Sequence, residues 1–184
     1  MFNSVELKNA LVFLPYAFIK PQNGGALRCF HLVQQLYKSV QLTVVTVHSE
    51  AEVQQAFPGI EVISTNKYKQ STTKNGLAFK LWKACKHRWY RKKWNEPANE
   101  FFLQLYPILK KQVKKNSYDW VVFENLEMVN WFAKICRYYL PKANLLYDAH
   151  NVDSALWQNL YKANPTKNHL IQYAKEAEKT ERNL

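Results

Sequence analysis

The paired glycines Gly24 and Gly25 stand at the start of an amphipathic segment, with Arg28 one turn further on. Glycine has no side chain, so backbone N–H groups at this point could approach an anion closely, and a helix N-terminus favours negative charge. Arg28 could reach a phosphate or an acceptor carboxylate. The alternatives are a conformationally permissive turn for the glycines and an ordinary solvated side chain for Arg28.

A second polar group follows two later apolar runs, because Glu124 comes after DWVVF and Asp148 to Asn151 come after NLLY. His150 could donate a hydrogen bond to a sugar hydroxyl or a developing oxyanion near neutral pH, or it could cap the next helix. Asn151 or Asp153 is a candidate N-cap of that helix. Asp148 could bind an acceptor or orient the loop. Glu124 could hold a hydroxyl or form a salt bridge with a nearby base.

Cysteine and histidine patterns give no metal or nucleophile site. The three cysteines include no C-x-x-C pair, which argues against a disulfide framework and a structural zinc site. Cys29 and Cys136 fall on apolar helix faces and are expected to be small buried hydrophobes, while Cys85 lies among basic residues without a base beside it. The remaining histidines have no sequence neighbours that suggest ligation: His31, His48, His87 and His169.

Short apolar runs alternate with amphipathic segments along the chain. The expected strands are Ala10–Leu14, Gln41–Val47, Ile60–Ser64, Asp119–Phe123 and Asn144–Tyr147. Strands that alternate with helices predict an α/β fold, namely a Rossmann-like, doubly wound, mainly parallel sheet with helices on both faces. Ligands of such sheets bind beyond the carboxyl ends of the strands. The glycine pair, Glu124 and the residues after NLLY are therefore expected at one shared edge.

Helical spacing defines the segments between the strands. Apolar residues from Ala26 to Tyr37 fall on one face of a predicted helix, and a similar pattern runs from Leu126 to Leu140. Glu96–Asn116 is also predicted to be helical, with Pro107 expected to kink or split it. The chain is expected to form one domain over residues 1–184. Its last residues, YAKEAEKTERNL, form a charged helix without a C-cap, so the domain looks truncated there.

Positive charge is concentrated in one part of the chain. The formal net charge is +12, and ten lysines and arginines lie between Val62 and Asn95 without an acidic residue, which leaves 12 − 10 = +2 for everything else. Tryptophans and other aromatics are interleaved in this stretch. From Lys67 to Trp94 it could bind nucleic acid, lie on an anionic membrane surface, or form a solvated basic helix.

Signals for export or membrane insertion are not found in the sequence. The longest apolar stretches are far below the roughly 18 residues that a membrane-spanning helix requires. The N-terminal residues Met1–Asn9 include Glu6 and Lys8 and lack the apolar core of a secretory signal. A cytoplasmic location is therefore expected, with peripheral contact at the inner face of the membrane as an extension of it.

Four segments together resemble the N-terminal domain of family-four glycosyltransferases, which are retaining, metal-independent enzymes of the GT-B fold. The segments are PYAFIKPQNGGALRCFHLVQQL, VQLTVVT, YDWVVFENLEM and NLLYDAHNVDSALWQNL. In that family a Gly-Gly pair precedes an arginine in the first helix, and a histidine, often within H-N, closes the fifth strand. Gly24, Gly25, Arg28, His150 and Asn151 occupy those places here.

The resemblance implies a sugar transfer from a nucleotide-sugar donor to a glycan or lipid-linked acceptor of the envelope polysaccharide type. It places the glycines at the donor diphosphate and His150 at the reacting sugar, and it gives acceptor binding to this domain. It implies no metal or other cofactor. Because many such enzymes use lipid-linked or envelope acceptors, membrane contact through Lys67 to Trp94 is favoured over a nucleic-acid partner.

Donor binding in that family belongs to a second Rossmann-like domain marked by a pair of glutamates in a glycine-rich setting. That motif is absent, and Glu176, Glu178 and Glu181 lie on the charged terminal helix instead. This chain alone is therefore expected to fold but not to catalyse. One alternative is a basic α/β protein that binds nucleic acid or a membrane surface without transferase activity. Another, a plain nucleotide-binding domain, would need a phosphate-binding fingerprint, and neither G-x-G-x-x-G nor G-x-x-x-x-G-K-[ST] is present.

Overall fold

A five-stranded sheet forms the centre of the computed structural model, which describes residues 8–14, 17–64, 81, 84–86, 88–89, 100–149 and 153–182. The strand order is β3-β2-β1-β4-β5, and every neighbouring pair is parallel. The strands are β1 (Asn9–Phe13), β2 (Gln41–Thr46), β3 (Glu61–Ser64), β4 (Trp120–Phe123) and β5 (Asn144–Tyr147). Each was predicted from the sequence to within about one residue at either end.

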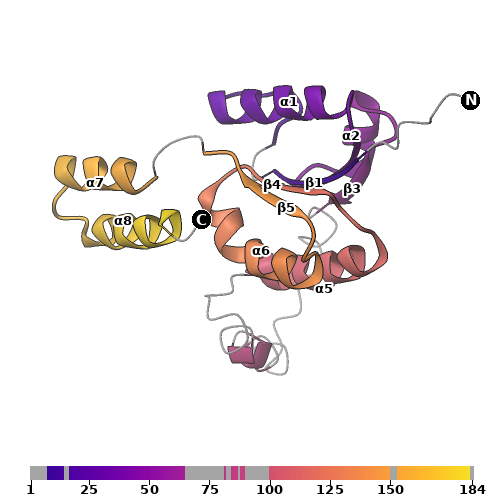
Figure 1. The fold of residues 1–184 in the computed structure, drawn as a ribbon. Helices are drawn as coiled ribbons and strands as arrows, with labels where there is room; N and C mark the ends of the chain where they lie inside the picture. The colour runs from indigo at the N-terminus through magenta and orange to yellow at the C-terminus, as the bar shows by residue number, and fades with distance from the viewer. Residues whose placement is uncertain are drawn as a thin grey trace, which may run out of the picture.

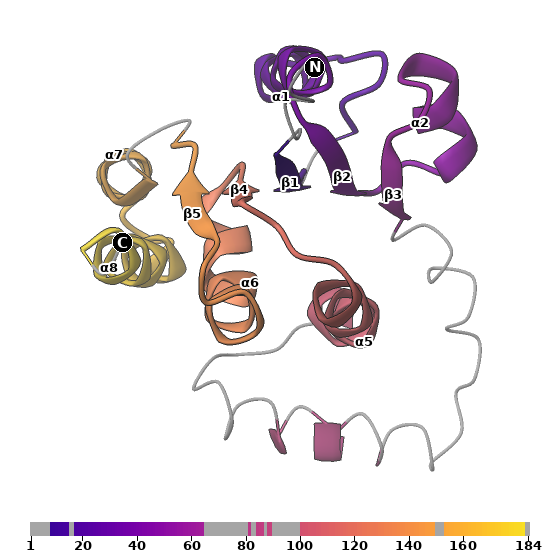
Figure 2. The same cartoon turned by 45° about the vertical axis from the view of Figure 1, so that its right-hand side comes forward.

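Helices cover both faces of the sheet, so the predicted doubly wound arrangement is confirmed (Figure 1). One face carries α1 (Gly24–Leu36) and α2 (Glu50–Ala56), and the other carries α5 (Glu100–Lys115) and α6 (Leu126–Tyr139). A hairpin of α7 (Asp153–Ala163) and α8 (Asn168–Glu181) follows β5 and lies to one side of the sheet, as Figure 2 shows.

The central strand β1 separates two hydrophobic cores. Leu11 and Phe13 point into the core beneath α5 and α6, whereas Ala10 and Val12 point into the core beneath α1 and α2. All four side chains are at most 1% exposed. Because alternate residues of a strand point to opposite faces, a strand that is buried on both sides needs a continuous apolar run. The sequence ALVF meets that requirement.

Helix α2 is an element that was not predicted. It begins with a capping box, in which the Ser49 N–H donates to Glu52 Oε2 at 2.8 Å and the Glu52 N–H donates to Ser49 Oγ at 3.3 Å. Such reciprocal bonds satisfy two backbone donors that a helix start leaves unpaired. The pair S-x-x-E was the available sequence signal for this helix.

Pro107 lies inside α5, and the helix continues from Glu100 to Lys115, so of the predicted kink or split, the split is wrong. Proline in a helix interior costs about 3 kcal/mol. The helix also buries Leu105, Leu109 and Val113 against the sheet, and each such side chain contributes about 1.5–3 kcal/mol. Packing therefore outweighs the local cost, while Pro107 itself faces solvent.

The α7–α8 hairpin is held together by its own small core and tied to α6 at one point. Leu170, Ala174 and Ala177 of α8 are buried, and Thr180 Oγ1 donates to Asn130 Oδ1 of α6 at 2.7 Å.

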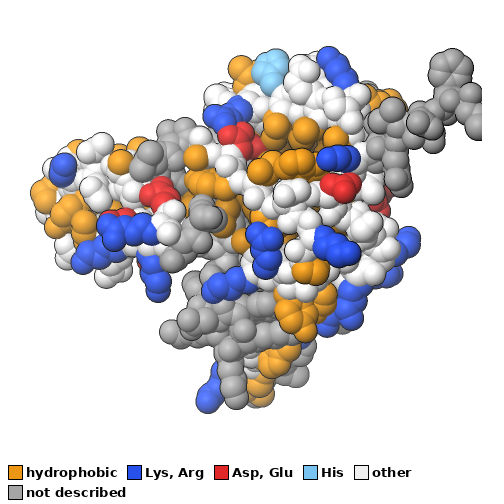
Figure 3. Space-filling model, viewed as in Figure 1, with side chains coloured by type: hydrophobic (Ala, Val, Ile, Leu, Met, Phe, Trp, Pro, Cys, Tyr) orange, Lys and Arg blue, Asp and Glu red, His pale blue; other side chains and the backbone are white. Residues whose placement is uncertain are grey.

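Figure 3 shows lysines and arginines spread over the hairpin and the α5–α6 side. Within the described ranges, every helix is too short or too polar to cross a bilayer.

Candidate functional site

The carboxyl ends of β1, β4 and β5 form the edge at which the sequence predicted a site. The ladder continues one residue beyond the strands, because the Glu124 N–H donates to the Phe13 carbonyl at 3.3 Å and the Asp148 N–H donates to the Phe123 carbonyl at 2.9 Å. The crossover helices change face between β1 and β4. Such a switch point is where open α/β sheets commonly bind ligands.

Helix α1 begins at this edge, and both glycines lie in its first turn. The Asn23 side chain caps the helix by accepting from the Ala26 N–H at 2.8 Å. Among the described residues, no hydrogen bond partner is found for the N–H of Gly24 or Gly25. Unsatisfied N–H groups at a helix start, together with the helix dipole, attract anions.

Neither glycine has a positive φ, so neither is required for a left-handed backbone conformation. A Cβ atom added to Gly24 would meet nothing within 4 Å, so helix packing does not require glycine there either. The left-handed residue of this region is Lys20, with φ of 59°, in the loop that precedes the helix. The space outside the helix at Gly24 is therefore open.

Arg28 and Asp148 meet across this edge, although they are 120 residues apart in the sequence. The Arg28 Nε donates to Asp148 Oδ2 at 3.1 Å, and a terminal guanidinium nitrogen binds Oδ1. The two side chains are 45% and 29% exposed. A pair this accessible contributes at most about 1 kcal/mol to stability. Its main effect is to fix a cation beside the start of α1.

Glu124 lies at the end of β4 and is completely buried. The Cys29 Sγ donates to its Oε2 at 3.5 Å. Burial, together with the charge of Glu124, raises the pKa of the Cys29 thiol to about 12. The thiol therefore stays protonated and can act as the donor. The buried Glu124 carboxyl thereby links α1 to the end of β4, and its predicted ligand role stays a prediction.

We expect one of the three thiols to react with an aromatic disulfide reagent in the native protein at pH 8. Cys85 is exposed, whereas Cys29 and Cys136 are buried, and burial raises the pKa of both buried thiols. Thiolate, not thiol, is the nucleophile. The measurement is the absorbance of released reagent, with all three thiols reacting in urea. A Cys85→Ser variant should release none in the native state, and prompt reaction of a second thiol would contradict this burial.

His150 and Asn151 lie outside the described residues, and so does the Asp153 side chain. The described chain runs through Ala149 and continues from Asp153. Since β5 ends at Tyr147 and Asp148 is already at the edge, His150 follows by two residues. The roles predicted for His150 and Asn151 stay predictions. In the described ranges, no group of three His, Cys, Asp or Glu residues could hold a metal ion.

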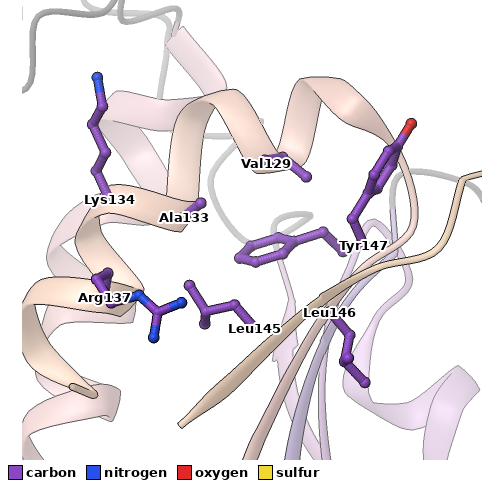
Figure 4. A pocket seen from close by; sticks show the side chains of 8 residues that line it. Val129, Ala133, Lys134, Arg137, Leu145, Leu146 and Tyr147 are labelled. Atoms are coloured by element: carbon purple, nitrogen blue, oxygen red, sulfur yellow. The ribbon is translucent and has the colours of Figure 1, made fainter. Parts of the chain in front are cut away.

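A pocket of about 290 Å³ lies on the other face of the sheet, between α6 and β5 (Figure 4). Leu145 and Tyr147 point from β5 toward α6, whereas Leu146 points away from it. Arg137 stands at one end and donates to the Ala143 carbonyl at 3.5 Å. The lining residues are Phe123, Val129, Ala133, Lys134, Arg137, Leu145, Leu146 and Tyr147. None of them was a predicted site residue.

The sequence offered no role for His48, but the structure gives it two partners next to the site. Its Nε2 accepts from the Ile19 N–H at 3.0 Å, and its Nδ1 lies 3.6 Å from Glu52 Oε1. The S-x-x-E capping box could have pointed to Glu52 from the sequence, whereas Ile19 contributes only its backbone N–H, which no sequence pattern marks.

The chain as a whole matches no protein-family model, no curated protein and no solved structure.

Proposed function

We propose that this chain is the acceptor-side, N-terminal domain of a two-domain glycosyltransferase that uses a nucleotide-sugar donor. The supporting observation is the start of α1, where the N–H groups of Gly24 and Gly25 lie at the same sheet edge as the Arg28–Asp148 pair. The motif order supports the same proposal, because the matching glycines, arginine and histidine occur at the places that family uses. The domain so proposed would be half of a GT-B fold.

Arg28 can bind a phosphate while it keeps its hydrogen bonds to Asp148. A guanidinium has five N–H donors, and Asp148 engages Nε and one terminal nitrogen. The outer edge of the guanidinium keeps its remaining N–H donors, and the Arg28 side chain is 45% exposed. Asp148 thereby sets the orientation of the guanidinium plane, while the outer donors and the helix amides can bind oxygen atoms of a diphosphate.

In this proposal the chain stabilises charge that develops on the departing diphosphate. Retaining transfer passes through an oxocarbenium-like transition state, and backbone N–H groups with a fixed arginine stabilise negative charge without reorganising. His150 would donate a hydrogen bond at the reacting sugar. The second domain would supply most of the donor-binding contacts, so this chain by itself would bind nucleotide sugars only at roughly millimolar levels.

Titration with inorganic pyrophosphate, followed by amide NMR, tests the anion site directly. We expect the Gly24 and Gly25 amide signals to shift on addition and Arg28→Gln to weaken binding about tenfold, because it removes one charge-assisted contact. Arg182→Gln is the matched control. Arg182 also pairs with a carboxylate, Glu178, but it lies on α8 and should leave the affinity unchanged.

Two outcomes would contradict the proposal. In the first, the glycine amides stay unshifted while signals from lysine-rich segments move, which would favour the alternative of a basic surface for nucleic acid or membranes. In the second, the chain alone binds a nucleotide sugar at micromolar affinity or better, which would remove the need for a second domain. The segment Lys67–Trp94, proposed to contact anionic membrane, lies mostly outside the described residues.

A further inference from the structure

Buried His48 connects β2 and α2 to the loop Ala17–Asn23, which leads from β1 into α1. The His48 side chain is 10% exposed. Its Nε2 accepts from the Ile19 N–H at 3.0 Å, and the Phe18 ring packs edge-on against it, with centroids 5.3 Å apart and an interplanar angle of 84°. The His48 N–H donates to Thr46 Oγ1 at 3.2 Å, which fixes the backbone at this point.

The bond from Ile19 fixes the position of the ring proton. A nitrogen that accepts a hydrogen bond carries no proton, so the neutral ring is protonated at Nδ1. That nitrogen faces Glu52 Oε1 at 3.6 Å. Hydrogen bonds from the Ser49 side chain and backbone lower the pKa of the Glu52 carboxyl. Glu52 therefore remains ionised in mildly acidic solution.

The hydrogen bond from the Ile19 N–H to His48 also holds one side of a strained turn. Lys20 has φ of 59°, a conformation that costs a non-glycine residue about 1–2 kcal/mol. Such strain persists only where the surrounding structure fixes the chain. The fully buried Phe18 and the Ile19–His48 bond fix it on one side, and the Asn23 cap of α1 fixes it on the other. Without the His48 acceptor, this side loses its hydrogen bond and keeps the packing of Phe18.

We propose that His48 is a positioning residue whose neutral ring holds the loop Ala17–Asn23 in place and whose protonation releases it. A proton on Nε2 would face the Ile19 N–H, so two donors would oppose each other and the bond would be lost. Within the described part of the chain, Glu52 is the charged side chain that contacts the ring, at Nδ1 and not at Nε2. The held loop is thus present at higher pH and lost as pH falls.

The relevance of this switch to ligands rests on the proposed function, because the loop carries the capping residue of the anion-binding helix. His48 acts through the loop and does not touch a ligand. Its test therefore needs a readout on the loop itself.

Hydrogen exchange at the Ile19 amide provides that readout. After correction for the intrinsic exchange rate, we expect protection in the unaltered chain to fall at least tenfold between pH 8 and pH 5. His48→Gln retains an acceptor oxygen without a titrating ring and should keep protection at both values. His48→Phe keeps a ring against Phe18 without an acceptor and should lack protection at both. His169→Gln, at an exposed histidine of α8, should behave as the unaltered chain.

Protection of Ile19 that does not change with pH in the unaltered chain would overturn the proposal, as would full protection in His48→Phe. If His48→Phe does not fold, the comparison of the unaltered chain with His48→Gln still decides, because only the former has a titrating ring at this position. The exchange experiment contains no anion. A failure of the proposed anion site would therefore appear in the pyrophosphate titration and not in the exchange data.

Discussion

Phe13→Ala is expected to lower the free energy of unfolding by about 3–5 kcal/mol. The Phe13 ring is fully buried at the end of β1 and stacks between Phe123 and Phe132, with centroids 5.0 Å and 4.9 Å away. Alanine would leave a cavity between the sheet and α6 and remove both ring contacts. Since domains of this kind are stable by about 5–15 kcal/mol, the loss would be a large part of the total.

Urea denaturation followed by circular dichroism measures this effect, with the slope of the transition expected to stay constant. Tyr138→Ala is a suitable control, because that side chain is 65% exposed, and the change should cost less than about 1 kcal/mol. Phe13→Leu should fall between the two. A loss below about 1 kcal/mol for Phe13→Ala would show that the ring does not occupy the core as described.

If the chain belongs to the proposed two-domain transferase, His150→Ala is expected to lower kcat/KM of that full-length protein about 100-fold to 1000-fold. This is the usual effect of removing one hydrogen-bond donor from charge that develops in a transition state. The thermal unfolding midpoint should change little, because the proposed role of His150 is at the reacting sugar and not in a hydrophobic core. The measurement is initial-rate kinetics of sugar transfer, together with a melting curve.

His169→Ala is the matched control, because His169 is an exposed histidine on α8 beside Tyr173. It should retain normal turnover. Unchanged rates in His150→Ala would contradict the proposed role. A fall in both rate and melting temperature would instead assign His150 to the start of α7 as a structural cap.

The sheet was predictable because its central strands are buried on both faces and therefore require continuous apolar runs. Helix α2 escaped prediction because Val53 is its one fully buried residue, so it has no apolar stripe. For Pro107, the sequence shows the local cost of proline inside a helix. It does not show that Leu105 and Leu109 of the same helix are buried against strands that are distant in sequence. Tertiary packing decided the case of Pro107, whereas a local capping box marks the start of α2.

The shared edge of the candidate site followed from the topology alone, since parallel strands end together. The contact between Arg28 and Asp148 could not be predicted, because each was equally compatible with a solvated side chain and they are distant in sequence. Burial of Glu124 depends on how α1 lies over β4, which no local pattern encodes. His48 acts through a backbone N–H, for which any residue at position 19 except proline would serve.

The position of β1 between β2 and β4 has a consequence for synthesis on the ribosome. β1 and β2 can pair early, but the next neighbour of β1 emerges about 110 residues later, as the bond from the Asn9 N–H to Asp119 indicates. At typical translation rates that interval is roughly 5–20 s. Leu11 and Phe13 lack their α5–α6 cover for that time, so the nascent chain has to withstand aggregation before its second core can close.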